Sequence, residues 1–394
     1  MMKKIRMGII GMGNMGGKYA TMIAGGNIPE IELKAVTRVH DEKLKEITEL
    51  LYQKGCKEIL PVFQSADDLF AAVREGKVEL DAVLIATPHY LHQEQSVLAL
   101  QLGLHVLCDK PAGVYSRQAR EMRQEAAKHE LIFAMIFNQR TNPVYGKMKE
   151  LVESGIYGKM KRVNWVVTDW YRPDFYYRSS SWRATWEKDG GGILLNQCPH
   201  NLDLLQWICG MPVRVQAFCH EGKYHPIEVE DEVTAYLEFG KGATGVFFAS
   251  TGEAPGINRL EISLEDALLV CEKGELKICE LGFHEPDYRK TATDCFKKLT
   301  GRWHTVECSG ENAQYIGVLQ NFADAVLKGK ALLAKGAEGS RSLLLSNAIY
   351  LSSWQKRMVE VPVENTDYER EFERLFEQEL EARVKNEVAV EELN

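Results

Sequence analysis

The chain has 394 residues, of which 45% are apolar and 26% charged, with a net charge of −8. This length exceeds one typical core and predicts two or three domains. The acidic balance excludes a nucleic-acid binder because phosphates require a basic surface, and no apolar run approaches the ~20 residues that span a bilayer. Nine scattered cysteines without zinc-ligand spacing indicate a cytoplasmic protein and predict no metal site.

The first part of the chain alternates short apolar runs with helical patterns, which is typical of βαβ units around a parallel sheet. The opening "MMKKIRMGIIGMG" resembles a secretory signal, but glycine interrupts its apolar run and no small-residue cleavage site follows. It therefore predicts a first strand. Helices are expected up to residue 24, at 41–55, up to residue 102, and from Ser116 as an N-cap. Strands are expected at 5–10, 31–36, 80–87, 105–111 and 131–137.

Beyond residue 143, β-branched and aromatic residues alternate in period two, which predicts a mostly antiparallel sheet with one covered face. The strand-like segments are 162–171, 213–220, 232–239, 243–250 and 260–272, and helices are expected at 144–153, 312–328 and 338–355. The expected fold is α/β, with a Rossmann dinucleotide-binding domain over 1–138. A substrate and oligomerisation domain with a large open sheet follows over 139–364. An acidic helical tail, 365–394, carries an apolar stripe of Tyr368, Phe372, Leu375, Phe376 and Leu380.

The glycine-rich stretch "GMGNMG" at 11–16 satisfies G-x-G-x-x-G directly after a strand and before a helix. Gly11 permits the tight turn, Gly13 lets the backbone approach a pyrophosphate, and Gly16 allows helix and strand to pack closely. The helix that begins around Asn14 and Met15 points its amide groups at the anion. This context predicts a bound dinucleotide.

The end of the second strand bears on the choice between NAD and NADP. An acidic residue there would bind the adenosine ribose and favour NAD, but the sequence has Thr37-Arg38. A hydroxyl beside a guanidinium suits the 2′-phosphate of NADP. Alternatively, Arg38 stacks on adenine or points to solvent, so both NAD and NADP remain candidates.

Two strand ends in the first domain carry chemically useful residues. "CDKPAG" (108–113) places Lys110 at the carboxyl edge of the sheet, where open α/β sheets bind ligands. Pro111 favours an extended Lys110 backbone, and a lysine beside a nicotinamide can stabilise a developing alkoxide. A surface lysine beside a turn is the alternative. "TPHYLH" (87–92) closes the preceding strand.

The stretch "GGGILLNQCPHNLDLL" (190–205) introduces an apolar helical pattern after three glycines. Asn196 and His200 are four residues apart and are expected on one helical face. His200 can accept the proton of a substrate hydroxyl as its hydride leaves, because the imidazole titrates near neutral pH. A core histidine with its bonds satisfied is the alternative, and Asp203 is expected to support the helix or loop.

Four stretches together resemble the successive signatures of the glucose–fructose oxidoreductase/inositol dehydrogenase (Gfo/Idh/MocA) family. They are "GIIGMGNMG", "AVLIATPHYLH", "LHVLCDKPAG" and "GGGILLNQCPHNLDLLQWICG". The resemblance continues over 338–363. It implies a Rossmann domain, a second domain whose open sheet forms an oligomer interface, and oxidation of sugars or polyols by hydride transfer to NAD(P). It makes Lys110 the catalytic lysine and His200 the catalytic histidine. The residues expected at the cofactor are Gly11, Gly13, Asn14, Met15, Gly16, Thr37, Arg38, Thr87, Pro88, His92, Asp109 and Lys110.

Asn196 departs from the pattern of this family, many members of which have an aspartate there. An amide cannot take up a proton, so we expect Asn196 to position the substrate. The stretch 168–192 is unusually aromatic and cationic, which suits either a sugar-binding wall or an interdomain or oligomer contact. The residues expected at the substrate are Asn138, Tyr177, Trp182, Arg183, Asn196 and His200.

The leading functional hypothesis is an NAD(P)-dependent dehydrogenase that acts on a ring hydroxyl of a sugar, glycoside or cyclic polyol. A redox-assisted glycoside hydrolase or lyase with retained cofactor, and a non-catalytic sugar or nucleotide sensor, are the alternatives. The presence of both Lys110 and His200 counts against a sensor, whereas Asn196 keeps it open. The expected partners are a small-molecule substrate and further copies of the chain, in a dimer or tetramer, with no nucleic acid or membrane.

Overall fold

The computed structural model describes residues 4–38, 40–56 and 58–391, with side chains up to residue 385. The chain divides into two compact units, each made from two separate stretches of sequence. The first unit ends at Thr141 and resumes over Asn312–Leu343; the second comprises Asn142–Glu311 and the residues from Leu344 onward. The expected second domain, 139–364, thus includes a stretch that the structure places in the first unit.

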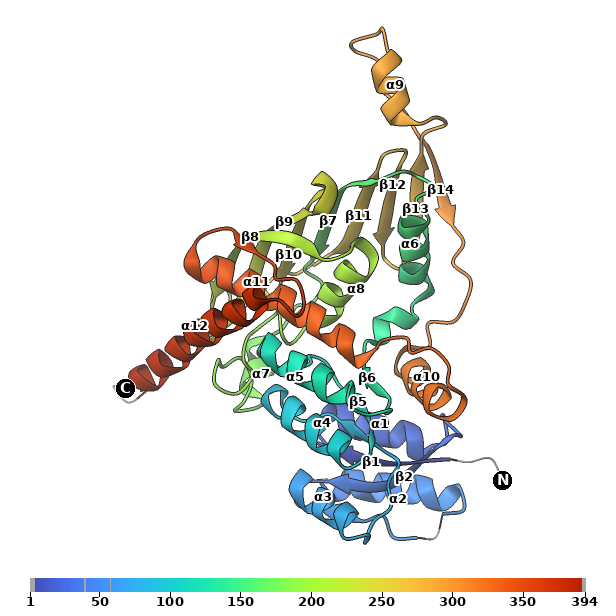
Figure 1. Cartoon of the computed structure of the whole chain (residues 1–394), viewed down its shortest axis with the longest axis vertical. Coiled ribbons are helices and arrows are strands. Elements are labelled where there is room, and N and C mark those ends of the chain that lie inside the picture. The colour runs from blue at the N-terminus through green and yellow to red at the C-terminus, as the bar shows by residue number, and fades with distance from the viewer. Residues whose placement is uncertain (1–3, 39, 57, 392–394) are drawn as a thin grey trace. The chain divides into compact units, whose positions relative to one another are not determined.

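Within the described ranges, six parallel strands form the sheet of the first unit, in the order β3-β2-β1-β4-β5-β6 (Figure 1). This doubly wound order places a nucleotide beyond the carboxyl ends of the strands. The side chains of β4 are all buried, as its continuous apolar run predicts. The strands are β1 (Ile5–Ile10), β2 (Ile31–Thr37), β3 (Val62–Phe63), β4 (Ala82–Ile85), β5 (His105–Cys108) and β6 (Phe133–Met135).

The helices of this unit begin close to where the sequence predicts them. For α5 the N-cap is Tyr115, whereas the sequence predicts Ser116, which is the first residue of the helix. Strand β3 and helix α3 have no counterpart among the expected elements, although Ser65 caps α3 by accepting the Asp68 amide at 3.0 Å. The helices are α1 (Asn14–Ala24), α2 (Asp41–Gln53), α3 (Ala66–Arg74), α4 (His92–Gln101), α5 (Ser116–Ala126) and α10 (Gln314–Lys328), with 3₁₀ turns η1 (His89–Leu91), η2 (Asn138–Thr141) and η4 (Gly336–Glu338).

Residues 312–343 belong to the first unit because they complete its core. Val318, Leu319 and Phe322 of α10 lie in the same buried cluster as Ile5 and Met7 of β1. The apolar face of α10 is removed from water only when the helix packs on the central sheet, so this packing stabilises both.

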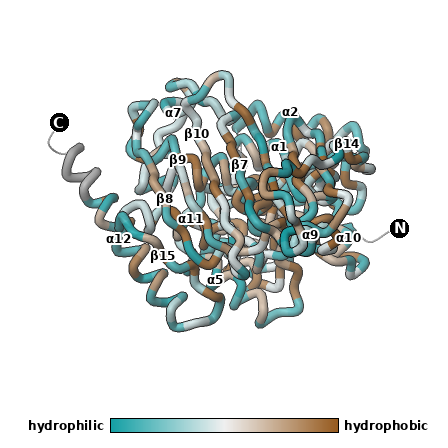
Figure 2. The backbone as a smooth tube through the Cα atoms, turned by 90° about the horizontal axis from the view of Figure 1, so that it is seen from above, coloured by the Kyte–Doolittle hydropathy of each residue, from teal (hydrophilic) through white to brown (hydrophobic). Residues whose placement is uncertain are grey.

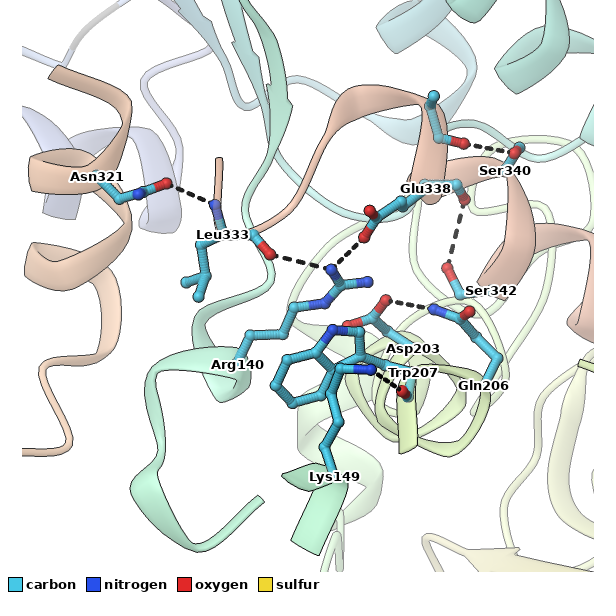
Figure 3. A network of polar contacts seen from close by, with 12 residues as sticks. Arg140, Lys149, Asp203, Gln206, Trp207, Asn321, Leu333, Glu338, Ser340 and Ser342 are labelled. Carbon is cyan, nitrogen blue, oxygen red and sulfur yellow. Dashed lines mark hydrogen bonds and ion pairs between the residues drawn. The ribbon is translucent and has the colours of Figure 1, made fainter. Parts of the chain in front are cut away.

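Polar contacts fasten the same stretch (Figure 3). The Arg140 guanidinium pairs with Glu338 and donates to the Leu333 carbonyl at 3.0 Å. Asn321 accepts the Leu333 amide at 2.7 Å. A buried guanidinium requires such partners, so Arg140 and the returning stretch stabilise each other.

The second unit is built on a mixed sheet with nine strands in the described part of the chain, ordered β14-β13-β12-β11-β7-β10-β9-β8-β15 (Figure 1). Its neighbours pair antiparallel apart from β7 and β10, which are parallel. The expected fold class is confirmed. The strands are β7 (Met160–Val167), β8 (Pro212–Glu221), β9 (Glu230–Phe239), β10 (Thr244–Ser250), β11 (Asn258–Leu264), β12 (Ala267–Glu272), β13 (Glu275–Glu280), β14 (Arg302–Val306) and β15 (Val359–Glu360).

One face of this sheet is covered and the other is open. In β7, Val163, Trp165 and Val167 are fully buried, whereas the alternating Asn164 and Val166 are partly exposed. This period-two burial is the expected pattern of a sheet with helices on one side. The helices of the unit are α6 (Pro143–Ser154), α7 (Asp174–Arg178), α8 (Pro199–Cys209), α9 (Glu285–Thr291), α11 (Gly339–Gln355) and α12 (Asp367–Glu391), with η3 (Gly240–Gly242); α11 starts in the first unit.

Helix α12 buries three of the five residues of the predicted apolar stripe, whereas Leu375 is partly exposed and Tyr368 is 38% exposed. Hydrophilic and hydrophobic residues interchange along it (Figure 2), and Phe372, Phe376 and Leu380 are at most 1% exposed. Phe376 stacks on Trp354 of α11 with ring centroids 5.4 Å apart. The helical tail is therefore packed on the second unit through its apolar side. Nowhere in the ranges described is a helix both long and apolar enough to cross a bilayer.

Candidate active site

The glycine loop between β1 and α1 has the geometry that a pyrophosphate requires. Gly11 has a φ of +89°, a conformation that favours glycine. A Cβ at Gly16 would overlap the Gly11 carbonyl oxygen, whereas a Cβ at Gly13 would meet nothing within 4 Å. No side chain caps α1, and no acidic residue lies in its first turn, which begins with Asn14 and Met15. The loop thus fits a dinucleotide, with Gly13 at the open approach.

These two glycines allow the fold and the nucleotide site to be tested separately. Gly13→Ala is expected to leave the thermal unfolding temperature unchanged and to weaken NADH binding about 10-fold or more, because the new methyl group fills the anion's space. Gly16→Ala is expected to destabilise the first unit by about 1–3 kcal/mol through overpacking. Fluorescence titration with NADH and thermal unfolding of both variants measure this; equal effects of the two changes on unfolding would contradict it.

Thr37 and Arg38 lie at the end of β2, as the sequence predicts. The Thr37 hydroxyl accepts the Gly11 amide at 3.0 Å and so helps to hold the glycine loop. Arg38 is exposed, and its Nε donates to the Gln64 carbonyl at 2.9 Å. The guanidinium is therefore oriented by backbone at the strand end where a ribose or its phosphate binds in this fold.

His92, which is expected at the cofactor, is held between two backbone carbonyls. It is 1% exposed, and its ring nitrogens lie 2.7 Å from the Pro111 carbonyl and 2.8 Å from the Thr87 carbonyl. Burial lowers its pKa. His92 thus joins the turn after β4, which contains Thr87 and Pro88, to the turn after β5, and its contact with the cofactor stays a prediction.

The turn after β5 presents Lys110 next to a buried carboxylate. Asp109 Oδ1 accepts the Lys110 amide at 2.9 Å, and its Oδ2 accepts the Tyr19 hydroxyl at 3.2 Å. Burial raises the pKa of Asp109, while the adjacent Lys110 opposes the rise. Lys110 itself is partly exposed at the carboxyl edge of the sheet. Asp109 thus orients the Lys110 backbone from inside the unit, and Tyr19 is a partner that no sequence motif indicated.

Asn138, expected at the substrate, lies in η2 of the first unit and is 3% exposed. Its Nδ2 donates to Gln314, at the start of α10. Its carbonyl accepts the Thr141 hydroxyl at 2.7 Å. Within its own unit, Asn138 therefore fastens the returning helix.

In the second unit, the glycine run at 190–192 is held by a buried carboxylate that the sequence analysis missed. Glu230 of β9 accepts the amides of Gly192 and Leu194, both at 2.9 Å, and the Tyr350 hydroxyl at 2.7 Å. A Cβ at Gly192 would overlap the Glu230 carbonyl oxygen, which explains the glycine. Burial raises the pKa of Glu230 to about 7. Glu230 therefore sets the path of the chain that leads to Asn196 and His200.

Asn196 and His200 do not share a helical face, contrary to the sequence expectation. Helix α8 begins at Pro199, so His200 is its second residue, while Asn196 lies in the preceding turns. Proline has no amide hydrogen and disfavours a helical residue before it, which makes Cys198 the N-cap. Both Asn196 and His200 remain partly exposed. Asp203 is buried and accepts the Gln206 amide group at 3.1 Å, which confirms its structural role.

The Asn196 amide is oriented at both ends. Its Nδ2 donates to Asp189 at 3.1 Å, and its Oδ1 accepts the Tyr176 hydroxyl at 3.2 Å. Arg183 Nη1 donates to the same phenol oxygen at 2.8 Å. A hydrogen-bonded chain thus runs from Arg183 through Tyr176 and Asn196 to Asp189. Tyr176 and Asp189 were not predicted, although both lie in the aromatic, cationic stretch that was.

Tyr177 and Trp182, which were expected at the substrate, contact this chain in different ways. The Tyr177 ring lies 5.1 Å from that of Tyr176 and 4.8 Å from that of His225, and its hydroxyl lies 2.8 Å from the Thr251 hydroxyl. Burial raises the pKa of Tyr177 to about 12. Trp182 lies 4.6 Å from the Arg183 guanidinium. The structure therefore joins Trp182, Arg183 and Asn196 through Tyr176, and Tyr177 packs on the ring of this same Tyr176 while its hydroxyl lies beside Thr251.

Two family models match this chain. The oxidoreductase family with an NAD-binding Rossmann fold matches residues 5–137, and the GFO/IDH/MocA C-terminal domain matches 145–270. Myo-inositol 2-dehydrogenase of Thermotoga maritima is 25% identical over 366 residues, which cover 91% of this chain and 98% of that protein. D-glucoside 3-dehydrogenase of Escherichia coli is 27% identical over 276 residues, covering 66% of this chain and 73% of that protein.

A solved structure shows the same fold. The WlbA dehydrogenase of Chromobacterium violaceum, in complex with NADH and UDP-GlcNAcA, has a TM-score of 0.73 and 25% identity, covering 92% of this chain and 97% of that one. Together the two family matches cover more than half of the chain. The chain therefore belongs to the Gfo/Idh/MocA family of NAD-binding oxidoreductases.

Proposed function

We propose that the protein oxidises a ring hydroxyl of a sugar, glycoside or cyclic polyol, with NAD or NADP as the hydride acceptor. The first unit holds the nucleotide and the second holds the sugar. One observation carries the proposal: a chain with an open anion-binding loop at Gly13 also has Lys110 at the carboxyl end of β5 and His200 at the start of α8. The two relatives described above, named for myo-inositol and D-glucosides, support this substrate class.

In this proposal each residue has a distinct task. His200 accepts the proton of the substrate hydroxyl, and the Lys110 ammonium stabilises the developing alkoxide. Asn196 positions the sugar, since its amide is already oriented by Asp189 and Tyr176. The nicotinamide, when bound, takes up the hydride. Gly11, Gly13 and Gly16 hold the dinucleotide, with Thr37 and Arg38 at its adenosine end.

The experiment that tests this function mixes the purified protein with a panel of hexoses, polyols and glycosides. NAD⁺ and NADP⁺ are supplied separately, and reduced nicotinamide is followed by absorbance. Continuous accumulation of reduced nicotinamide with one substrate is the expected result. A preference for NADP⁺ over NAD⁺ would assign Arg38 to the 2′-phosphate. A burst limited to the amount of enzyme, with the sugar cleaved afterwards, would replace the proposal by a redox-assisted hydrolase. Nucleotide binding without any oxidation of the panel would count against it.

We also propose that the protein is a cytoplasmic homo-oligomer that associates through the open face of the β7–β15 sheet. Phe218 is 58% exposed on this face, and Tyr236 and Val246 beside it are 38% and 39% exposed. An exposed apolar sheet face of this kind is typical of a protein interface.

Phe218→Glu is expected to shift the protein toward monomer, because a carboxylate would be buried unpaired at the interface. Light scattering coupled to gel filtration measures the change. Ile156→Glu, at a 69% exposed position in the turn after α6, is the matched control and is expected to keep the native assembly. An unchanged mass of the Phe218→Glu variant would contradict the assignment of this face.

A further inference from the structure

Two arginines in the stretch 168–192 stack on one tyrosine. The guanidinium carbons of Arg172 and Arg183 lie 5.0 and 4.5 Å from the centroid of the Tyr176 ring. Each also stacks on a tryptophan, Arg172 on Trp170 at 5.3 Å and Arg183 on Trp182 at 4.6 Å. This Arg172–Arg183 cluster concentrates two positive charges on aromatic faces of the second unit.

In the part of the chain that the structure describes, no carboxylate forms an ion pair with the arginines of this cluster. Arg172 donates to the Tyr171 carbonyl at 3.0 Å, and Arg183 to the Tyr176 hydroxyl at 2.8 Å. The Nε atoms of both are buried without a hydrogen-bond partner.

Other cations of the same stretch lie near carboxylates. Arg178 lies 3.9 Å from Asp174, and Lys188 lies 3.7 Å from Glu187. The nearby carboxylate of Asp189 accepts hydrogen bonds from the Asn196 side-chain amide and from the Ala184 backbone amide. Partly buried charges without ionic partners are costly, so the presence of these two arginines favours a ligand that supplies the anion.

The cluster is also connected to the proposed substrate site. Arg183 donates to the Tyr176 phenol, which donates to Asn196, the residue to which we assign substrate positioning. Arg172 and Arg183 both remain partly exposed, so a ligand can reach them. An anionic group on a sugar held at Asn196 would therefore lie beside the two guanidinium groups.

We propose that the substrate is an acidic sugar, whose carboxylate or phosphate is bound by Arg172 and Arg183. The planar guanidinium fork matches both oxyanions, and stacking on Tyr176 holds it ready at a low entropic cost. This inference rests on the proposed function and narrows its substrate class from sugars in general to sugars that carry an oxyanion.

The test compares matched pairs: D-glucose with D-glucuronate, D-galactose with D-galacturonate, and D-glucose with its 6-phosphate. Binding to the NADH-loaded protein is measured by calorimetry, and NAD(P)⁺ reduction by absorbance, at constant ionic strength. At least one acidic sugar is expected to bind about 10- to 100-fold more tightly than its neutral partner. Preference for a uronate or for the 6-phosphate then identifies which oxyanion is bound.

The Arg183→Gln and Arg172→Gln variants are expected to lose this preference. Arg183→Lys should restore part of it, because the charge remains but the stacked fork does not. Arg178→Gln, an exposed neighbour in α7, is the matched control and should keep the wild-type ratio. Thermal unfolding of each variant shows whether a lost preference is due to a lost fold.

The outcomes separate this inference from the proposed function. Equal binding of neutral and acidic sugars, or binding of acetate and inorganic phosphate as tight as that of the acidic sugars, would overturn the inference while leaving sugar oxidation intact. Tight binding of an acidic sugar without its oxidation would uphold the inference and count against the dehydrogenase. A protein that binds none of the sugars would overturn both.

Discussion

Replacing His200 with alanine is expected to lower kcat by about 10²- to 10⁴-fold, the usual contribution of a positioned general base. The imidazole at the start of α8 is the group to which we assign the proton of the substrate hydroxyl. Without it, the alkoxide must form by proton loss to water, so the remaining rate should rise with hydroxide concentration. Steady-state kinetics between pH 6 and 10 on the best substrate of the sugar panel measure both effects.

The controls for His200 separate chemistry from binding. NADH affinity and thermal unfolding of the His200→Ala variant should match the wild type, because the nucleotide loop lies in the other unit. His304→Ala, at an exposed position in β14, is a histidine variant that should keep full activity. A His200→Ala enzyme that turns over at the wild-type rate would remove the histidine from the mechanism.

The stability of the second unit is expected to fall as the pH rises through 7, because of Glu230. Burial raises the pKa of Glu230 to about 7 from its ordinary 4.5, so the folded state holds the proton more tightly than the unfolded chain. The stabilisation is fully present below about pH 4.5 and is lost as the pH passes 7. The shift corresponds to about 3 kcal/mol of unfolding free energy.

Glu230→Gln removes this titration, so comparison with the wild type isolates the contribution of Glu230 to the pH dependence of the unfolding free energy. Urea unfolding at pH 5 and pH 8.5 should show that the wild type loses about 2–3 kcal/mol more than the variant between the two values. Glu238→Gln, a partly exposed position on the same strand, should titrate like the wild type. Parallel behaviour of wild type and Glu230→Gln would show that the buried carboxyl stays ionised throughout, held by its three donors.

Much of the first unit could be predicted from local sequence. Glycine at 11, 13 and 16, together with continuous apolar strands and helix caps, specifies βαβ units through interactions between residues close in the chain. Strand β3 was missed because two residues give no periodicity, and α3 because its Ser65-x-x-Asp68 cap was overlooked. The return of 312–343 was missed because an apolar helical face does not indicate which sheet it covers.

Part of the candidate site could be predicted from the sequence, but Tyr176, Asp189 and Glu230, with the contacts they make, could not. Sequence motifs and local composition indicate four of its residues, Lys110, His200, Asn196 and Arg183. Glu230 was missed because it accepts amides 36 and 38 residues away, with helix α8 and strand β8 in between, and no local pattern indicates such a contact. The shared helical face of Asn196 and His200 was wrong because Pro199 marks where the helix begins.

The division of the nucleotide-binding unit into two stretches has a consequence for how the protein is made. Val318, Leu319 and Phe322 belong to the same core as Ile5 and Met7. On a ribosome, which emits the chain from its N-terminus, the first 141 residues must wait for more than 170 others before this core can close. Folding of the dinucleotide unit therefore cannot be completed before residues 312–343 have left the ribosome, so the core around Ile5 and Met7 stays without these partners while residues 142–311 are made.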